Sequence, residues 1–90
     1  MLRLQPTTQF IKDRNKAEKR GLPMERLDAV LQLLLEERPL DIKHRDHELS
    51  GRYRGFRECH ILPDWLLVYA VDNKNLVLVA SRTGTHSDLF

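Results

Sequence analysis

The chain has 90 residues, of which 41% are hydrophobic and 31% are charged, with a formal net charge of +2. These values fit one globular domain over residues 1–90, and they exclude a disordered chain or a membrane-spanning segment. A single cysteine excludes an internal disulfide framework, and the first residues lack the apolar core of a signal peptide. We therefore expect a cytoplasmic protein with no membrane partner.

A short strand and two helices are expected in the first half of the chain. Leucines alternate with a polar residue at positions 2–4, as in a strand, and Thr7 or Thr8 can then cap a helix. Gly21 ends this helix, because glycine readily adopts the left-handed conformation that follows a last turn. A second helix ends before Pro39. Its apolar residues recur at three- and four-residue spacing: Leu27, Val30, Leu31, Leu34 and Leu35.

The second half of the chain predicts three strands. Residues FRECHI (56–61) alternate between the two faces of a sheet, so that His60 lies on one face and Cys59 on the other. The apolar run WLLVYAV (65–71) is typical of a central strand covered on both faces, and LVLVAS (76–81) is the last strand. The order β-α-α-β-β-β predicts an α+β domain in which a helical hairpin packs on a small antiparallel sheet. Cys59 is then a buried, unreactive thiol.

Strand pairing predicts which polar side chains meet. A turn near residues 62–63 places Ile61 near Trp65, and a turn between Asn73 and Lys74 places Trp65 opposite Arg82. This register gathers a set of polar residues at one end of the sheet: His60, Asp64, Arg82, Thr83 and the start of the tail RTGTHSDLF (82–90). Strand pairing does not locate His47, which lies in the preceding loop.

These residues suit acid–base chemistry on RNA. Histidine is the side chain best suited to act as both acid and base, and Asp64 can orient either His60 or His86. Arg82 can stabilise the charge that develops on a phosphorus centre. In RNA transesterification the 2′-OH of the substrate is the nucleophile, so that neither a metal nor a covalent intermediate is needed. Three plainer interpretations stay open: histidines that are only surface residues, Asp64 as a turn residue paired with Arg82, and a transition-metal site.

Residues 47–90 carry a more specific pattern. They read H-x-L-x-G-x-Y-x-G-x-R-x-x-H-x-x-P-D-W-L-L-V-Y, followed by R-T-G-T-H and a terminal Leu-Phe. This half of the chain resembles the YafQ branch of the RelE-like toxins of bacterial toxin–antitoxin systems. The first half resembles that branch in its layout, a strand and two helices, more than in identity. The resemblance implies a RelE-like fold, in agreement with the fold expected from periodicity.

The resemblance implies a ribosome-dependent endoribonuclease that cleaves mRNA in the A site of the 70S ribosome without a cofactor or metal. It also implies a cognate DinJ/RelB-like antitoxin, which silences the toxin and through which their hetero-oligomer binds operator DNA. The catalytic positions carried over are His47, His60, Asp64, His86 and Phe90. Two further matches, Arg57 and Arg82, are phosphate contacts or supports of the site.

The roles expected within this set are specific. His86 is the general acid or the main transition-state contact, and His47 is the candidate base. Asp64 is expected to pair with His60, and the ring of Phe90 stacks on or braces the substrate base. His44 is expected to be a surface residue. The alternatives are a non-catalytic module that binds an antitoxin or the ribosome, and a metal-dependent nuclease.

Overall fold

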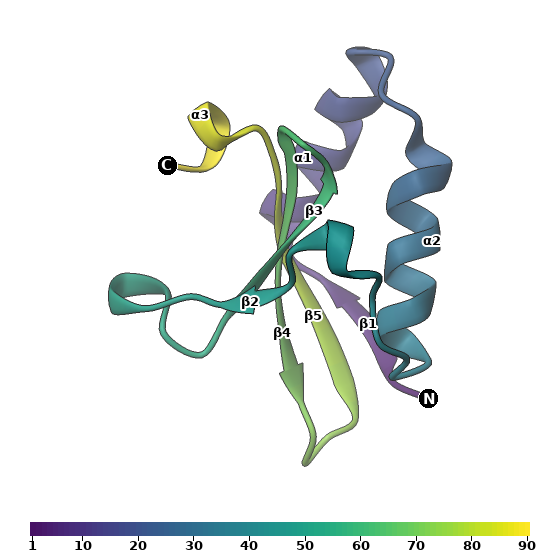
Figure 1. Ribbon diagram of the computed structural model, residues 1–90, viewed down its shortest axis with the longest axis vertical. Coiled ribbons are helices and arrows are strands. Elements are labelled where there is room, and N and C mark those ends of the chain that lie inside the picture. The colour runs from purple at the N-terminus through teal and green to yellow at the C-terminus, as the bar shows by residue number, and fades with distance from the viewer.

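The computed structural model describes residues 1–90 and confirms the α+β class (Figure 1). The strands are β1 (Arg3–Pro6), β2 (His47–Glu48), β3 (Arg57–Leu62), β4 (Trp65–Asp72) and β5 (Val77–Gly84). The helices are α1 (Thr8–Lys19), α2 (Met24–Leu35) and α3 (His86–Leu89), with 3₁₀ turns η1 (Ile42–His44) and η2 (Gly51–Tyr53). None of the helices is long and apolar enough to cross a membrane.

The ends of the helical hairpin follow from local signals in the sequence. The hydroxyl of Thr7 accepts a hydrogen bond from the backbone N–H of Phe10 at 3.0 Å, which caps α1. The same hydroxyl donates to the carbonyl of Ser81 at 2.8 Å, which ties the start of α1 to β5. Gly21 follows α1 with a φ of +80°, a conformation that is strained for residues with a side chain.

The sheet is mixed, and not antiparallel throughout as the strand pattern predicted. Its order is β1-β5-β4-β3-β2, and β1 runs parallel to β5 while the other pairs are antiparallel. Tight turns join β3 to β4 and β4 to β5, which forces these neighbours to be antiparallel. The chain between β1 and β5 includes two helices and three strands, so no turn constrains their relative direction.

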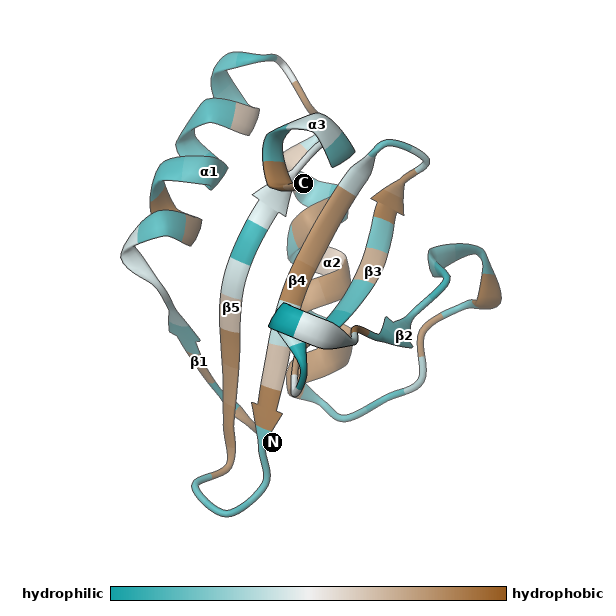
Figure 2. Cartoon of the chain, turned by 90° about the vertical axis from the view of Figure 1, so that its left-hand side faces the viewer, coloured by the Kyte–Doolittle hydropathy of each residue, from teal (hydrophilic) through white to brown (hydrophobic).

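Most residues of β4 are apolar (Figure 2), and they are buried on both faces, as predicted for a central strand. On one face, Trp65, Leu67 and Tyr69 pack into the main core with α1 and α2. On the other face, Leu66 and Val68 form a smaller cluster with Leu89 of α3. The helix α3 therefore has its own apolar anchor on the sheet.

The first hairpin has the predicted register and the second does not. His60 lies opposite Leu66, as a turn near residues 62–63 requires. In the second hairpin Arg82 lies opposite Val68, and not opposite Trp65, because the turn is centred one residue later and a bulge interrupts the ladder between Val68 and Tyr69. When the centre of a turn moves by one residue, the partner of every residue in the hairpin changes by two positions.

Cys59 occupies the face of β3 that packs in the main core, with 0% of its surface exposed. Burial in these apolar surroundings raises the pKa of its thiol to about 12. The thiol therefore stays protonated at neutral pH, which agrees with the prediction of a buried, unreactive cysteine.

Candidate active site

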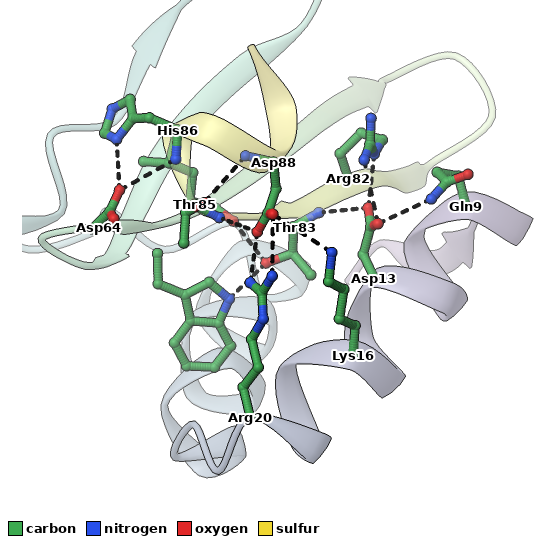
Figure 3. A network of polar contacts seen from close by, with 12 residues as sticks. Gln9, Asp13, Lys16, Arg20, Asp64, Arg82, Thr83, Thr85, His86 and Asp88 are labelled. Atoms are coloured by element: carbon green, nitrogen blue, oxygen red, sulfur yellow. Dashed lines mark hydrogen bonds and ion pairs between the residues drawn. The ribbon is translucent and has the colours of Figure 1, made fainter.

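Three of the predicted residues meet at one end of the sheet. His60 lies on β3, Asp64 lies in the turn between β3 and β4, and His86 begins α3. The carboxylate of Asp64 accepts a hydrogen bond from Nδ1 of His86 at 2.9 Å and another from its backbone N–H at 3.2 Å (Figure 3). The rings of His60 and His86 have centroids 5.7 Å apart. The convergence expected from strand pairing is confirmed for these residues.

The expected pairing of Asp64 with His60 is wrong. Nδ1 of His60 donates to the carbonyl of Pro63 at 3.2 Å, so its ring is held by the turn itself. Hydrogen bonds from the side chain and the backbone of His86 lower the pKa of Asp64. Asp64 is therefore ionised near neutral pH and is the partner of His86.

The structure adds Glu58 to the site and locates His47. The short strand β2 pairs with β3 so that His47 lies opposite Glu58. Oε1 of Glu58, which is only 6% exposed, lies 3.8 Å from Nε2 of His47 and 3.9 Å from Nε2 of His60. A buried carboxylate between two imidazole rings can stabilise whichever ring is protonated. The alternation of β3, which places Glu58 on the face of His60, was the signal for this role.

All four histidines use the same ring nitrogen, Nδ1, for a hydrogen bond within the protein. In each ring, Nδ1 lies within hydrogen-bond distance of an oxygen that can only accept, so Nδ1 carries the proton in the neutral form. His86 donates to the carboxylate of Asp64, and His60 donates to the carbonyl of Pro63. His47 donates to the carbonyl of Arg45, and His44 donates to the carbonyl of His60. Nε2 is therefore the nitrogen left to exchange protons or to bind a ligand. A fixed tautomer of this kind is what general acid–base catalysis requires.

His44 is not the surface residue that the sequence indicated. It is half-buried at the end of η1, and its Nδ1 donates to the carbonyl of His60 at 2.6 Å. Asp41 caps this 3₁₀ turn locally, but the contact of His44 with His60 joins residues 16 positions apart, and no local pattern indicated it.

The terminal helix α3 is held by a capping box and an ion pair. The hydroxyl of Thr85 accepts from the backbone of Asp88 at 3.1 Å, and the carboxylate of Asp88 accepts from the backbone of Thr85 at 3.0 Å. The guanidinium of Arg20 at the end of α1 donates to both oxygens of Asp88, at 2.7 and 3.2 Å (Figure 3). The spacing Thr85-x-x-Asp88 is a capping-box signal that the sequence analysis did not use.

The terminal ring of Phe90 lies at the edge of the site. It is 59% exposed, and it contacts Tyr53 of η2 in an edge-to-face arrangement with centroids 5.4 Å apart. Such a contact holds the ring in place while one of its faces stays free for a base. This geometry agrees with the stacking role expected for Phe90.

The two arginines pair with carboxylates outside the histidine site. Arg82 binds Asp13 of α1 through Nε at 2.7 Å and Nη2 at 3.3 Å, so the alternative that Arg82 pairs with Asp64 is wrong. Arg57 lies opposite Tyr69 on the sheet, and its Nε donates to Asp46 at 3.3 Å. Both guanidinium groups are already held by carboxylates, which favours the supporting role over the phosphate contact.

Low pH should unfold the protein, because it protonates the carboxylates of Asp88 and Asp13 and so weakens their interactions with the arginines. Hydrogen bonds from Arg20 lower the pKa of Asp88 far below its usual range. Burial raises the pKa of Asp13, but hydrogen bonds from Arg82, Gln9 and Thr83 outweigh it and lower the pKa overall. Since the folded-state values lie below the unfolded value of about 3.9, this stability is complete above about pH 4 and is lost as the pH falls further.

Urea unfolding measured between pH 5 and pH 2 tests this expectation. Asp88→Asn should flatten part of the dependence, because the asparagine carries no titrating proton. An unchanged pH profile in that variant would contradict the role of Asp88.

The histidine cluster also offers ligands for a metal ion. One ligand atom each from Glu58, His60 and His86 lies within 4.8 Å of the other two. Two imidazole nitrogens and one carboxylate oxygen suit zinc or copper(II). The side chains that suit proton transfer therefore also suit metal binding.

Comparison with known proteins identifies the family. A family described as a bacterial toxin of type II toxin-antitoxin system, YafQ, matches residues 2–90. The mRNA interferase toxin YafQ of Escherichia coli K12 is 40% identical over 83 residues, which cover 91% of this chain and 88% of that protein.

Two crystal structures resemble the chain over its full length. A metal-bound toxin from Helicobacter pylori has a TM-score of 0.95 at 40% identity, and the match covers 100% of both chains. A chain of the E. coli DinJ–YafQ complex has a TM-score of 0.91 at 35% identity over 100% of this chain and 99% of its own.

The fold and the site thus define a small toxin of the RelE-like kind, and the chain belongs to the YafQ family of bacterial type II toxin–antitoxin systems. It is an enzyme of the same class as its curated relatives, an endoribonuclease.

Proposed function

We propose that this toxin cleaves mRNA in the A site of the 70S ribosome by metal-independent acid–base transesterification. The observation that carries the proposal is that His47, His60 and His86 each use Nδ1 for a hydrogen bond within the protein. Nε2 of each ring therefore stays available for proton transfer. The substrate supplies the 2′-OH as nucleophile, so the protein has only to move protons and stabilise charge. The likeness to an E. coli mRNA interferase supports mRNA as the substrate.

The geometry supports a division of roles among these residues. His86 is the general acid that protonates the leaving 5′-oxygen, since Asp64 holds its Nδ1 proton and stabilises the charged ring. His47 is the base that removes the proton of the 2′-OH. Glu58 lies between His47 and His60 and stabilises whichever ring is protonated. The exposed ring of Phe90 stacks on a substrate base.

Purified 70S ribosomes programmed with mRNA test the proposal directly. We expect primer extension to show a new 5′ end in the A-site codon after the toxin is added. The upstream product should carry a 2′,3′-cyclic phosphate, because the 2′-OH attacks the adjacent phosphorus. No cleavage, or cleavage that leaves a 3′-hydroxyl, would contradict the reaction proposed.

Phe90→Ala is expected to reduce cleavage less than any histidine variant. Loss of stacking on one base corresponds to about 1–3 kcal/mol, or roughly a 5- to 150-fold loss in mRNA affinity. The loss should appear at low toxin concentration and should largely disappear at saturation, since the ring positions the base and takes no proton. Phe90→Trp, which keeps a stacking surface, is the matched control. A Phe90→Ala toxin with the affinity of the unchanged protein would remove the stacking role.

The metal ligands provide a second test of the acid–base proposal. Zinc or copper(II) bound by Glu58, His60 and His86 would occupy one ring nitrogen of each histidine. The likeness to a metal-bound toxin supports such binding. We expect either ion to inhibit cleavage and EDTA to restore it, measured on the dialysed toxin with magnesium retained for the ribosomes. Activation by zinc or copper(II) would instead favour a metal-dependent nuclease.

We also propose that a cognate antitoxin of the DinJ/RelB-like kind silences this toxin in the cytoplasm, and that their hetero-oligomer binds operator DNA through the antitoxin. The complex of E. coli YafQ with DinJ supports this partner. Co-expression of the neighbouring reading frame should rescue growth that the toxin alone arrests. Arrest that persists with a toxin lacking His86 would favour the alternative, a non-catalytic binding module.

A further inference from the structure

We propose that a pocket beside η1 binds a backbone phosphate of single-stranded RNA next to the candidate active site. The inference rests on the proposed function, since it assigns a further subsite to the same RNA. The pocket has a volume of about 320 Å³ and lies among α2, η1 and the end of β3. Its polar lining consists of Arg26, Lys43, His44, Arg45 and His60.

The pocket gathers positive charge that nothing in the protein neutralises. Arg26, Lys43 and Arg45 form no ion pair, and their side chains donate no hydrogen bond to another protein group. No carboxylate lines the pocket. By contrast, Arg20 and Arg82, elsewhere on the surface, are held by Asp88 and Asp13. Unpaired cations around a concave site raise the local concentration of anions.

The backbone at Arg45 is a second, independent sign of a binding role. Its φ of 47° and ψ of 44° lie in the left-handed region, where a residue with a side chain is strained and glycine is not. Strained positions of this kind gather at binding and catalytic sites. The carbonyl of Arg45 accepts the Nδ1 proton of His47 at 2.7 Å, so the residue that lines the pocket also orients a histidine of the site.

The position of the pocket favours an RNA phosphate over a free anion. His60 lines the pocket, and its Nε2 lies 3.9 Å from Glu58 on the side of the candidate active site. His44 connects the two regions through its hydrogen bond to the carbonyl of His60. An RNA strand whose reacting phosphodiester lies between His60 and His86 therefore has a neighbouring phosphate within reach of Lys43 and Arg45. A flexible, single-stranded backbone can follow this path, and lysine and arginine are the usual partners of its phosphates.

Binding of a short, fluorescent, 2′-O-methylated RNA tests the subsite without ribosomes and without cleavage, since this RNA has no free 2′-OH. Fluorescence anisotropy over a series of salt concentrations gives both the affinity and its salt dependence. We expect Lys43→Gln and Arg45→Gly each to weaken binding by roughly three- to tenfold and to reduce the salt slope by about 0.7. Lys74→Gln removes the same charge in the distant turn between β4 and β5, and it should change the affinity by less than about twofold.

Arg45→Gly separates binding from folding. Glycine relieves the left-handed backbone and keeps the carbonyl that His47 uses, so its melting temperature should equal or exceed that of the unchanged protein while RNA binding falls. Equal effects of all three variants on RNA affinity, an unchanged salt slope, or no binding by the unchanged toxin would overturn the proposal. Weaker antitoxin binding with unchanged RNA affinity would also overturn it and would indicate an acidic protein segment as the occupant.

The subsite and the proposed enzymatic function can fail separately. If the unchanged toxin does not cleave mRNA on ribosomes but its RNA affinity still depends on Lys43 and Arg45, the pocket stands as an RNA-binding site. If the toxin cleaves normally and the two variants bind RNA as the Lys74→Gln control does, the function stands and the subsite is wrong.

Discussion

His86→Gln is expected to lower the single-turnover rate of mRNA cleavage on ribosomes by about 10²–10⁴-fold, the usual contribution of a general acid or base. Glutamine can still donate a hydrogen bond to Asp64, but it cannot exchange a proton near neutral pH. The side chain of His86 is 55% exposed and contributes little to the core, so the fold should not change. The rate is measured by primer extension at saturating toxin.

A matched control lies one residue further along α3. Ser87 is exposed and its side chain forms no hydrogen bond to another residue, so Ser87→Ala should leave the rate nearly unchanged. Circular dichroism and antitoxin binding show whether each variant is folded. A His86→Gln toxin with the rate of the unchanged protein, or one that is inactive only because it unfolds, would refute the role of His86.

Asp13→Ala is expected to destabilise the protein by about 2–4 kcal/mol, a large part of the 5–15 kcal/mol that is typical of a domain. The carboxylate is only 8% exposed and accepts from the side chains of Arg82 and Gln9 and from the backbone N–H of Thr83. Its removal leaves that N–H without a partner and the guanidinium without its counter-charge. Arg82 keeps a third of its side chain in solvent, which limits the loss.

Asp28→Ala is the control for this prediction. Asp28 pairs with Arg14 at 2.9 Å, but its side chain is 56% exposed, so loss of this ion pair should change the free energy of unfolding by less than about 1 kcal/mol. Urea unfolding measures both variants. Equal and small losses would mean that Asp13 acts as an ordinary surface charge.

Two ion pairs from α1 thus reach the strand and helix that carry the end of the chain. Asp13 holds Arg82 and the backbone of β5, and Arg20 holds Asp88 of α3. His86 lies within the same short helix as Asp88, between the two residues of its capping box, Thr85 and Asp88. The position of His86 is therefore coupled to the packing of α1 on the sheet.

Much of this architecture was predictable from local patterns. The cap at Thr7, the stop at Gly21 and the doubly covered strand Trp65–Asp72 all follow from interactions between residues close in sequence. The meeting of Asp64 with the tail was predictable too, because a two-residue turn sets the register of the first hairpin. The family pattern supplied His47, which no pairing argument could locate.

The errors arose where loops or distant segments decide the geometry. The second hairpin was misplaced because its turn is centred one residue later than expected and a bulge follows, and neither is marked by periodicity. The partner of Arg82 was missed since Asp13 is 69 residues away in sequence. His44 was assigned to the surface because the carbonyl that it contacts, that of His60, lies 16 residues away in sequence.

The sequence by itself determined the class of fold, the helical hairpin and the central strand, because side-chain periodicity, caps and short turns act between near neighbours. Only the tertiary structure decided that β1 runs parallel to β5, that Asp64 holds His86, and that Glu58 lies between two imidazoles. These contacts depend on how separate elements pack together, and packing brings together residues that no local pattern relates.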